Sequence, residues 1–211
     1  MRKAYPWVLI VLAFVFSAVV VGRLPERVPV HWNWRGEADG WGGRWEGAFV
    51  LPGLMLGLWV LLRVLPRIDP RRANYARFQS SYDLVLNALI TGLALFHVLM
   101  VGRALGWPLP LPRIVNGLVG MLLIVVGNVL PRIRPNWWIG VRTPWTLSSD
   151  RVWARTHRVA GYLMLGAGVA WLIAAALPAL WTIGVGAAAL AVVAAVSIVY
   201  SYWAWRKEQR T

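Results

Sequence analysis

The sequence predicts an all-α integral membrane protein with six transmembrane helices and with both its N- and C-termini in the cytoplasm. Three observations lead to this prediction. Six apolar runs each approach the ~20 residues that cross about 30 Å of hydrocarbon. Apolar residues make up 59% of the chain and charged residues 14%, against about 45–50% and about 25% in a typical soluble domain. The basic residues also gather at the ends of the apolar runs.

The six runs are expected to be helices, because a backbone in lipid must satisfy its own hydrogen bonds. They cover residues 5–22, 48–65, 84–101, 114–130, 160–177 and 180–203. The first run follows Arg2 and Lys3, as in a signal peptide. However, Val21-Gly22-Arg23 is a poor cleavage site and five more runs follow, so an uncleaved helix is expected.

The distribution of basic residues predicts the orientation. With a cytoplasmic N-terminus, the inner segments hold 16 of the 22 Lys and Arg residues and the outer loops hold 6. This agrees with the excess of positive charge on cytoplasmic loops. A net charge of +14 would suggest nucleic acid as the partner of a soluble protein, but topology explains it here, so no direct nucleic-acid binding is expected. The chain has no cysteine and therefore no disulfide or thiolate metal site.

The predicted organisation is one membrane domain with two parts. Residues 1–83 would form an N-terminal helix pair with an extracellular loop, 23–47, and a first inner loop. Residues 84–211 would form a four-helix region with an inner loop, 131–159. The sequence Leu65-Pro66-Arg67-Ile68-Asp69-Pro70 returns as Leu130-Pro131-Arg132-Ile133-Arg134-Pro135. This indicates either a duplication of helix pairs or a coincidence of stop signals, with Pro66 and Pro131 each ending a helix.

The outer loop is expected to be structured, with residues 28–32 extended and turns following. Its candidate ligand-binding residues are His31, Trp32, Asn33, Glu37 and Asp39. Three of these, His31, Glu37 and Asp39, are potential metal ligands. No second histidine or helical His-x-x-x-His spacing accompanies them, and turn carboxylates commonly bond nearby backbone amides, so no metal site is predicted.

A polar stripe on the third helix is a further candidate. Gln79, Asp83, Asn87 and Thr91 are four residues apart and share one helix face. They would either form interhelical hydrogen bonds or line a polar pathway and pair with an inner-loop arginine. His97, on the same helix, lies off this stripe and is expected to pack and hydrogen-bond.

The inner loop between the fourth and fifth runs has the most distinctive composition. All six basic residues between Arg132 and Arg158 are arginines, and prolines and tryptophans accompany them. Ser148 or Ser149 can cap a helix that has Asp150 in its first turn. Trp153 and His157 would then lie one turn apart. The segment 143–146 before it is expected to be extended.

The residues of this loop resemble the SdpI family of bacterial membrane proteins. The resemblance is carried by Gly127-Asn128-x-Leu130-Pro131-x-Ile133-Arg134-Pro135-Asn136-x-Trp138-x-Gly140-x-Arg142-Thr143-Pro144-Trp145-Thr146-Leu147-Ser148-Ser149, followed by Val152-Trp153-x-x-Thr156-His157. Two further stretches are similar to a domain of unknown function that often precedes this family. They are Leu24-Pro25-x-x-Val28-Pro29-x-His31-Trp32-Asn33 with Gly36-x-x-Asp39-Gly40, and Ile68-Asp69-Pro70-Arg71-x-x-Asn74-Tyr75. The likeness covers roughly residues 24–165.

This resemblance implies a multi-pass protein of the bacterial cell membrane with a binding and signalling role. The expected partners are the lipid bilayer, an extracellular peptide toxin against which the protein gives immunity, and a cytoplasmic repressor that it holds at the membrane. The residues expected to form the inner-loop partner or structural motif are Asn128, Pro131, Arg132, Arg134, Pro135, Asn136, Trp138, Gly140, Arg142, Thr143, Pro144, Trp145, Thr146, Trp153 and His157.

Two functional classes remain open, and an enzyme is not expected. The first is the binding and signalling protein, and the second is a transporter or lipid-handling protein. A hydrolase is disfavoured because Gly-x-Ser-x-Gly and His-Glu-x-x-His are absent, and no cofactor is predicted. We further expect Arg134 and Arg142 to hold carboxylates, on a partner or at Asp83 or Asp150, because arginine binds carboxylates bidentately. Trp145, Trp153 and His157 would supply an adjacent aromatic face, whereas the simpler alternative is that the arginines only set the orientation.

Overall fold

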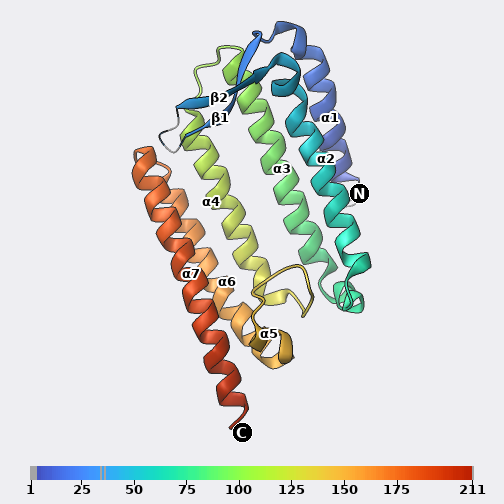
Figure 1. Ribbon diagram of the computed structural model, residues 1–211, viewed down its shortest axis with the longest axis vertical. Coiled ribbons are helices and arrows are strands. Elements are labelled where there is room, and N and C mark those ends of the chain that lie inside the picture. Colours follow the sequence, from blue (N-terminus) through green and yellow to red (C-terminus); the bar gives the residue numbers. More distant parts are fainter. Residues whose placement is uncertain (1–3, 34, 36, 211) are drawn as a thin grey trace.

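The protein is a bundle of long helices with a small β-hairpin at one end. A computed structural model describes residues 4–33, 35 and 37–210, so Arg2, Lys3 and Gly36 lie outside the described residues. The long helices are α1 (Tyr5–Val20), α2 (Arg44–Ile68), α3 (Gln79–Ala104), α4 (Leu111–Val129), α6 (Asp150–Ala174) and α7 (Ala179–Glu208) (Figure 1). All six are long and apolar enough to cross a membrane, which confirms the predicted all-α polytopic fold.

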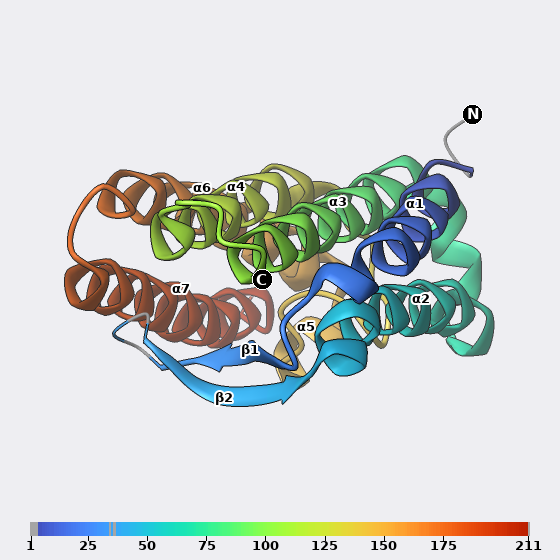
Figure 2. The same ribbon diagram turned by 90° about the horizontal axis from the view of Figure 1, so that it is seen from above.

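Short elements connect the long helices at both ends. Three 3-10 turns cover Val21–Arg23, Arg72–Arg77 and Leu130–Arg132, and the one-turn helix α5 covers Pro144–Ser148. Strands β1 (Arg27–Trp32) and β2 (Ala38–Gly43) pair antiparallel between α1 and α2. The base of this hairpin is anchored by Val28, which is fully buried against Gly47, where a Cβ would lie 2.6 Å from a Val28 methyl. From this anchor the hairpin extends from α2 toward α7 (Figure 2).

The six long helices form one bundle. Helices α1, α2 and α3 pack around a core that includes Ile10, Met55 and Leu86, and this core continues into α4 and α6. Helix α3 also packs on α4, and α6 packs on both α4 and α7. The backbones of α4 and α6 approach closely at two glycine pairs. A Cβ at Gly127 would lie 2.6 Å from Leu165 N, and one at Gly120 would lie 2.9 Å from Leu172 N. Small residues permit this close approach between membrane helices.

Two prolines lie inside α2, and one of them corrects a prediction. Pro66 was expected to end its helix, but α2 continues to Ile68 and ends where Asp69, extended before Pro70, leaves the helical conformation. Pro66 has no N–H for the Leu62 carbonyl four residues earlier, and the Tyr82 hydroxyl of α3 donates to that carbonyl instead. A neighbouring helix therefore satisfies the backbone group that the proline leaves unpaired.

Pro52 shows the same arrangement near the other end of α2. The Ala48 carbonyl, four residues before Pro52, accepts a hydrogen bond from the Ser17 hydroxyl of α1 at 2.5 Å. Ser17 also lies 2.9 Å from Nε2 of His97 on α3. His97 is fully buried, so its packing and hydrogen bonding agree with the prediction. Pro131, by contrast, lies just beyond α4, in the 3-10 turn Leu130–Arg132.

Candidate functional site

The candidate site lies where two loops meet at the end of the bundle opposite the hairpin (Figure 1). The first loop connects α2 to α3 and the second connects α4 to α6. We call residues 69–78 and 130–149 together the two-loop junction. The hydrogen bonds across it link residues more than 60 positions apart in the chain.

Asp69 is the central acceptor of the junction. It is 2% exposed. Its Oδ1 accepts from the Arg71 backbone N–H at 2.7 Å, and its Oδ2 accepts from the Tyr75 hydroxyl and the Trp137 backbone N–H, both at 2.9 Å. Three donors thus stabilise one buried carboxylate, which removes the penalty of burying it alone. Burial and the neighbouring Asp69 raise the pKa of Tyr75 well above its usual value, so this phenol stays neutral.

Asn136 organises the second loop around the first. Its side chain is fully buried. Oδ1 accepts from the backbone N–H groups of Trp138 and Ile139 at 2.9 and 2.7 Å, and Nδ2 donates to the carbonyls of Arg134 and Ile139. These bonds close the turn that follows Pro135. Asn74 of the first loop donates to the Pro135 carbonyl at 2.7 Å, so the two loops interlock at a second point.

Arg71 extends this connection to the start of α6. Its Nη2 donates to the Leu147 carbonyl at 3.1 Å, and its Nη1 lies 3.5 Å from a carboxylate oxygen of Asp150. Asp150 is the first residue of α6, and Ser149 caps the helix by accepting from the Val152 N–H. The predicted cap and helix start are therefore confirmed.

Trp153 and His157 hold the second loop against α6. Both are almost fully buried and their rings stack with centroids 4.0 Å apart, as their spacing predicted. Trp153 donates to the Ile133 carbonyl, while His157 contacts the Trp153 carbonyl through Nδ1 and the Val141 N–H through Nε2. Gly140, with φ at +110°, passes so close to His157 that a side chain would not fit.

The segment 143–146 differs from its prediction. Thr143 alone is extended, and Pro144 begins the short helix α5. A proline is well tolerated at the first position of a helix, because the N–H there has no partner within the helix. Thr143 caps α5 by accepting from the Thr146 N–H and also donates to Ser201 of α7 at 3.0 Å. The Trp145 ring packs on Tyr202 of α7.

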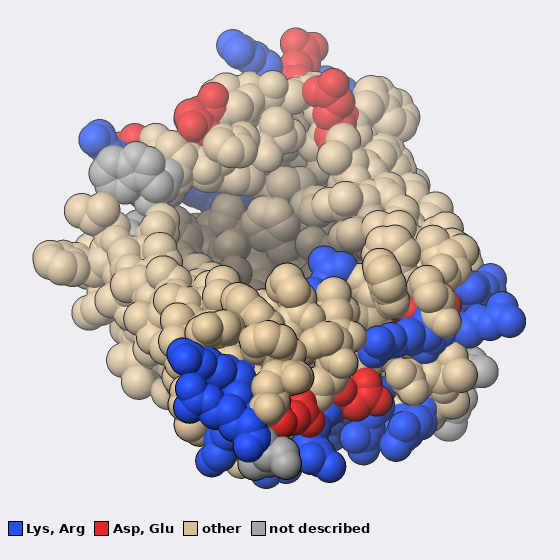
Figure 3. Space-filling model, turned by 60° about the horizontal axis from the view of Figure 1, so that its bottom comes forward, with Lys and Arg blue, Asp and Glu red and all other residues tan. Residues whose placement is uncertain are grey.

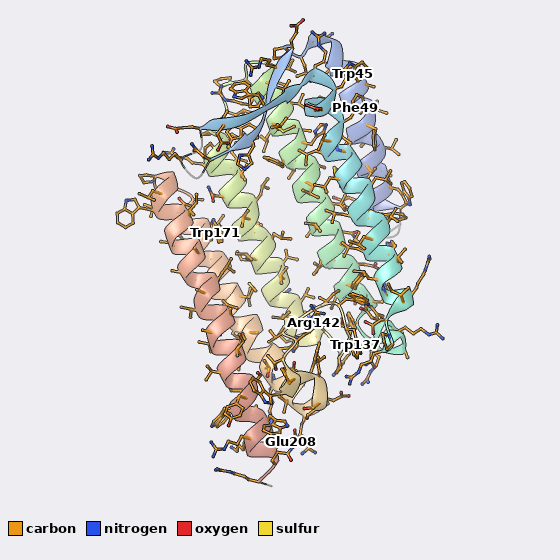
Figure 4. The ribbon with its side chains drawn as sticks, viewed as in Figure 1. Trp45, Phe49, Trp137, Arg142, Trp171 and Glu208 are labelled. Atoms are coloured by element: carbon orange, nitrogen blue, oxygen red, sulfur yellow. The ribbon has the colours of Figure 1, made fainter. Side chains whose placement is uncertain are left out.

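Arginines and tryptophans are exposed on the surface of the junction. Arg132, Arg134, Arg142, Trp137 and Trp138 are all exposed. Arg142 reaches back to donate to the Trp137 carbonyl (Figure 4). In Figure 3 most of the Lys and Arg side chains in view gather at this end, and the molecule is hollowed between this end and the hairpin. The Asn128 side chain and Arg132 guanidinium lie 3.5 Å apart.

The expected internal partners of Arg134 and Arg142 are occupied by other arginines. Asp83 pairs with Arg63 of α2 at 3.1 Å, and Asp150 pairs with Arg71. The prediction of an internal pair with Asp83 or Asp150 is therefore wrong. For Asp83 the reason is that Arg63 lies on the neighbouring helix α2 and its guanidinium contacts this carboxylate directly. A carboxylate on a binding partner remains a prediction.

The polar stripe on α3 forms hydrogen bonds within and between helices. Gln79 donates to Asp83 at 3.1 Å, and Thr91 donates to the Asn87 carbonyl at 2.7 Å and lies 2.9 Å from the Tyr5 hydroxyl of α1. The side-chain oxygen of Asn87, on the same stripe, is buried, but within the described part of the chain it has no hydrogen-bond partner.

The outer-loop candidates lie on the hairpin. His31 Nδ1 lies 2.5 Å from an Asp39 carboxylate oxygen across the two strands. Asn33 donates to Glu37 at 3.0 Å and accepts from the backbone of the turn. The Trp32 ring meets Phe96 of α3 edge-on. Among the residues described, no group of three potential His, Cys, Asp or Glu metal ligands occurs.

The residues of the first loop were not predicted to form part of the site, although Asp69, Arg71, Asn74 and Tyr75 make most of the bonds across the junction. One signal was available, since Asp69 lies inside the repeated hexapeptide and Asn74 follows it closely. Their partners are mainly backbone groups, which a sequence pattern does not reveal.

Comparison with known proteins agrees with these observations. Residues 132–201 match the SdpI/YfhL protein family, and residues 8–56 match a domain of unknown function, DUF1648. The chain is 26% identical over 161 residues to a protein named Immunity protein SdpI from Bacillus subtilis (strain 168), which covers 76% of this chain and 75% of that protein. No solved structure matches. The resemblance to the SdpI family is confirmed, and with the six apolar helices it identifies a multi-pass bacterial membrane protein.

Proposed function

We propose that this membrane protein with an SdpI-type region acts as an immunity protein that recognises a secreted peptide toxin. The hairpin would contact the toxin outside the cell, and the two-loop junction would bind a cytoplasmic protein, such as a repressor, and hold it at the membrane. The name of the Bacillus subtilis relative supports the immunity role. The positive charge at the junction supports its cytoplasmic placement.

One observation carries the binding role of the junction. Its buried polar groups, Asp69 and Asn136, are bonded on every side, whereas the guanidinium groups of Arg132 and Arg134 point outward. A loop that served only to connect two helices would not need such internal bracing. A rigid loop loses little conformational entropy on binding, so exposed arginines carried on it suit a partner that presents carboxylates.

The hairpin suits contact with an extracellular partner. It is held to the bundle at Val28 but presents Val30 and Trp41, with 41% and 53% of their surfaces exposed. Aromatic side chains such as Trp41 are enriched in protein-binding surfaces. The His31–Asp39 pair fixes the two strands beside them.

Expression in toxin-sensitive cells tests both halves of the proposal. The parent chain should raise survival in the toxin, and His31→Ala with Trp41→Ala should abolish this protection without changing the amount of membrane protein. Arg132→Gln with Arg134→Gln should preserve survival but lose capture of the cytoplasmic partner. If the parent chain gives no protection at full membrane expression, the immunity role is wrong.

The alternative function, a transporter or lipid-handling protein, predicts a different result. Purified protein in liposomes would then produce ligand-dependent flux of an ion or lipid. The hydrogen bonds among Gln79, Asp83 and Arg63 occupy the inner part of the stripe that would have lined a polar path. Toxin protection without flux supports the immunity role, whereas flux without protection supports the alternative.

A further inference from the structure

Helix α6 carries a row of three arginines on its exposed side. Arg151, Arg155 and Arg158 are four and three residues apart, so they share one side of the helix, and all three are exposed. Tyr162, four residues after Arg158, continues the row and has 68% of its surface exposed. Because α6 packs on α4 and α7 through its other sides, this row faces the surroundings of the protein.

The apolar run of α6 places these arginines relative to the bilayer. The run begins at residue 160, and the helix is continuous from Asp150. At the rise of an α-helix, Arg158 lies about 3 Å outside the hydrocarbon, Arg155 about 7.5 Å and Arg151 about 13.5 Å. The headgroup layer on each side of a bilayer is about 5–7.5 Å thick. Arg155 and Arg158 therefore lie at the level of the headgroups, whereas Arg151 lies beyond them.

The described part of the chain supplies no counter-charge for Arg155 and Arg158. The carboxylates in the expected cytoplasmic half of the protein are Asp69, Asp83, Asp150 and Glu208. Asp69 is buried in the two-loop junction, where three donors satisfy it. The other three carboxylates pair with Arg63, Arg71 and Arg151. An anion that neutralises Arg155 and Arg158 must therefore come from outside this part of the chain.

The orientation of the protein does not require this pair of arginines. Without the pair, the 16 basic residues of the inner segments fall only to 14, against 6 in the outer loops, which still satisfies the positive-inside rule. Two like charges three residues apart on a helix also repel each other. A bound anion would remove this repulsion, and the fork of N–H donors on arginine suits the oxygens of a phosphate.

We propose that Arg155 and Arg158 bind the phosphate of an anionic phospholipid from the inner leaflet. The Tyr162 hydroxyl would donate to an ester oxygen of the same lipid. The acyl chains would lie along the next turns of this face, where Gly166 and Val169 are exposed. A zwitterionic headgroup would bind less well, because its own ammonium group already neutralises the phosphate. The site lies outside the two-loop junction, and the proposal does not depend on the immunity role.

Quenching of a single fluorophore by lipid tests the site directly. Gly166→Cys supplies one thiol in this cysteine-free chain, at an exposed position where a Cβ meets no atom within 4 Å. This position lies about 12 Å along the helix from Arg158, toward the middle of an acyl chain. The full-length protein, labelled there with bimane, is placed in vesicles of phosphatidylcholine. A nitroxide on the acyl chain of either phosphatidylglycerol or phosphatidylcholine, at equal mole fraction, then quenches the label.

The ratio of the two quenching efficiencies measures the preference for the anionic lipid. One basic residue near the surface attracts such a lipid by a factor of about five, so one or two contacts should give a preference of about 5-fold to 30-fold. Arg158→Gln should lower the preference by about fivefold, and the addition of Arg155→Gln should abolish it.

Arg151→Gln is the matched control. It removes the same charge from the same row, but at a distance from the bilayer greater than the Debye length of about 10 Å, so the preference should stay within about twofold of the parent value. Equal quenching by nitroxide-labelled phosphatidylcholine in all variants shows that the label remains at the same depth in a folded protein.

Two results would overturn the proposal. The first is equal quenching by phosphatidylglycerol and phosphatidylcholine in the parent chain. The second is an equal loss of preference in Arg151→Gln and Arg158→Gln, because this would assign the preference to the general positive charge at this end of the molecule. Neither result bears on toxin protection, which is measured in cells.

Discussion

Replacing Asp69 by asparagine should open the two-loop junction. The substitution keeps the shape of the side chain but leaves one oxygen where the carboxylate has two. The two oxygens of Asp69 accept from two backbone N–H groups, those of Arg71 and Trp137, and from the Tyr75 hydroxyl. In either orientation of the amide, one backbone N–H must face the new NH2 group. A lost bond to a charged acceptor, with a buried donor left unpaired, costs about 2–4 kcal/mol.

Trypsin cleavage after Arg142 measures this opening. The purified protein in detergent micelles exposes both ends to the protease, and mass spectrometry quantifies the single cut. If cleavage requires local opening that is fast and reversible, its rate follows the open population. The Asp69→Asn variant should then be cleaved roughly 30-fold to 700-fold faster.

Asp150→Asn is the matched control for this experiment. It makes the same chemical change in an exposed ion pair with Arg71, whose oxygen–nitrogen distance is 3.5 Å. Exposed pairs contribute about 0–1 kcal/mol, so cleavage should change by less than about fivefold. Equal cleavage rates in the parent and Asp69→Asn would refute the role assigned to Asp69.

Three further predictions concern other parts of the molecule. In this cysteine-free chain, an impermeant thiol reagent on intact cells should label Glu37→Cys but not Ser148→Cys, and labelling of the second alone would contradict the orientation. Gly127→Ala should lower the free energy of unfolding by about 1–3 kcal/mol, because its Cβ would meet the α6 backbone, whereas Gly166→Ala has open space and should not. Because the pKa of Tyr75 is raised in the folded protein, the unfolded chain loses the phenol proton at a lower pH than the folded chain does. The free energy of unfolding should therefore fall as the pH rises above about 10. If it falls equally steeply in the Tyr75→Phe variant, this prediction is wrong.

The elements that could be predicted from the sequence are those determined by local signals. Apolar runs of the right length predict the six long helices, and Ser149 followed by Asp150 predicts the start of α6. The boundaries were less accurate, because hydrophobicity does not mark where a helix leaves the apolar layer. Helix α2 covers Arg44–Ile68, for example, whereas the expected apolar run covers residues 48–65.

The contacts of the site could not be predicted because they are distant and involve the backbone. Asp69 and Trp137 are 68 residues apart, and the group that Asp69 binds is a main-chain N–H that every residue except proline possesses. Pro66 illustrates the same limit. The rule that proline ends a helix did not hold here, because a tyrosine hydroxyl on another helix satisfies the freed carbonyl. The close contact of α4 and α6 did have a signal, the seven-residue spacing of Gly120 and Gly127.

The repeated hexapeptide explains why the two loops have different roles. Its copies, 65–70 at the end of α2 and 130–135 directly after α4, reach the same junction. They differ at one position, Asp69 in the first copy and Arg134 in the second. Asp69 is buried and accepts from the second loop, whereas the Arg134 side chain is exposed. A carboxylate can be satisfied by backbone donors within the protein, but a guanidinium has only donors and needs acceptors. The first copy therefore holds the junction together, and the second leaves on its surface a cation that, under the proposed function, would bind a partner.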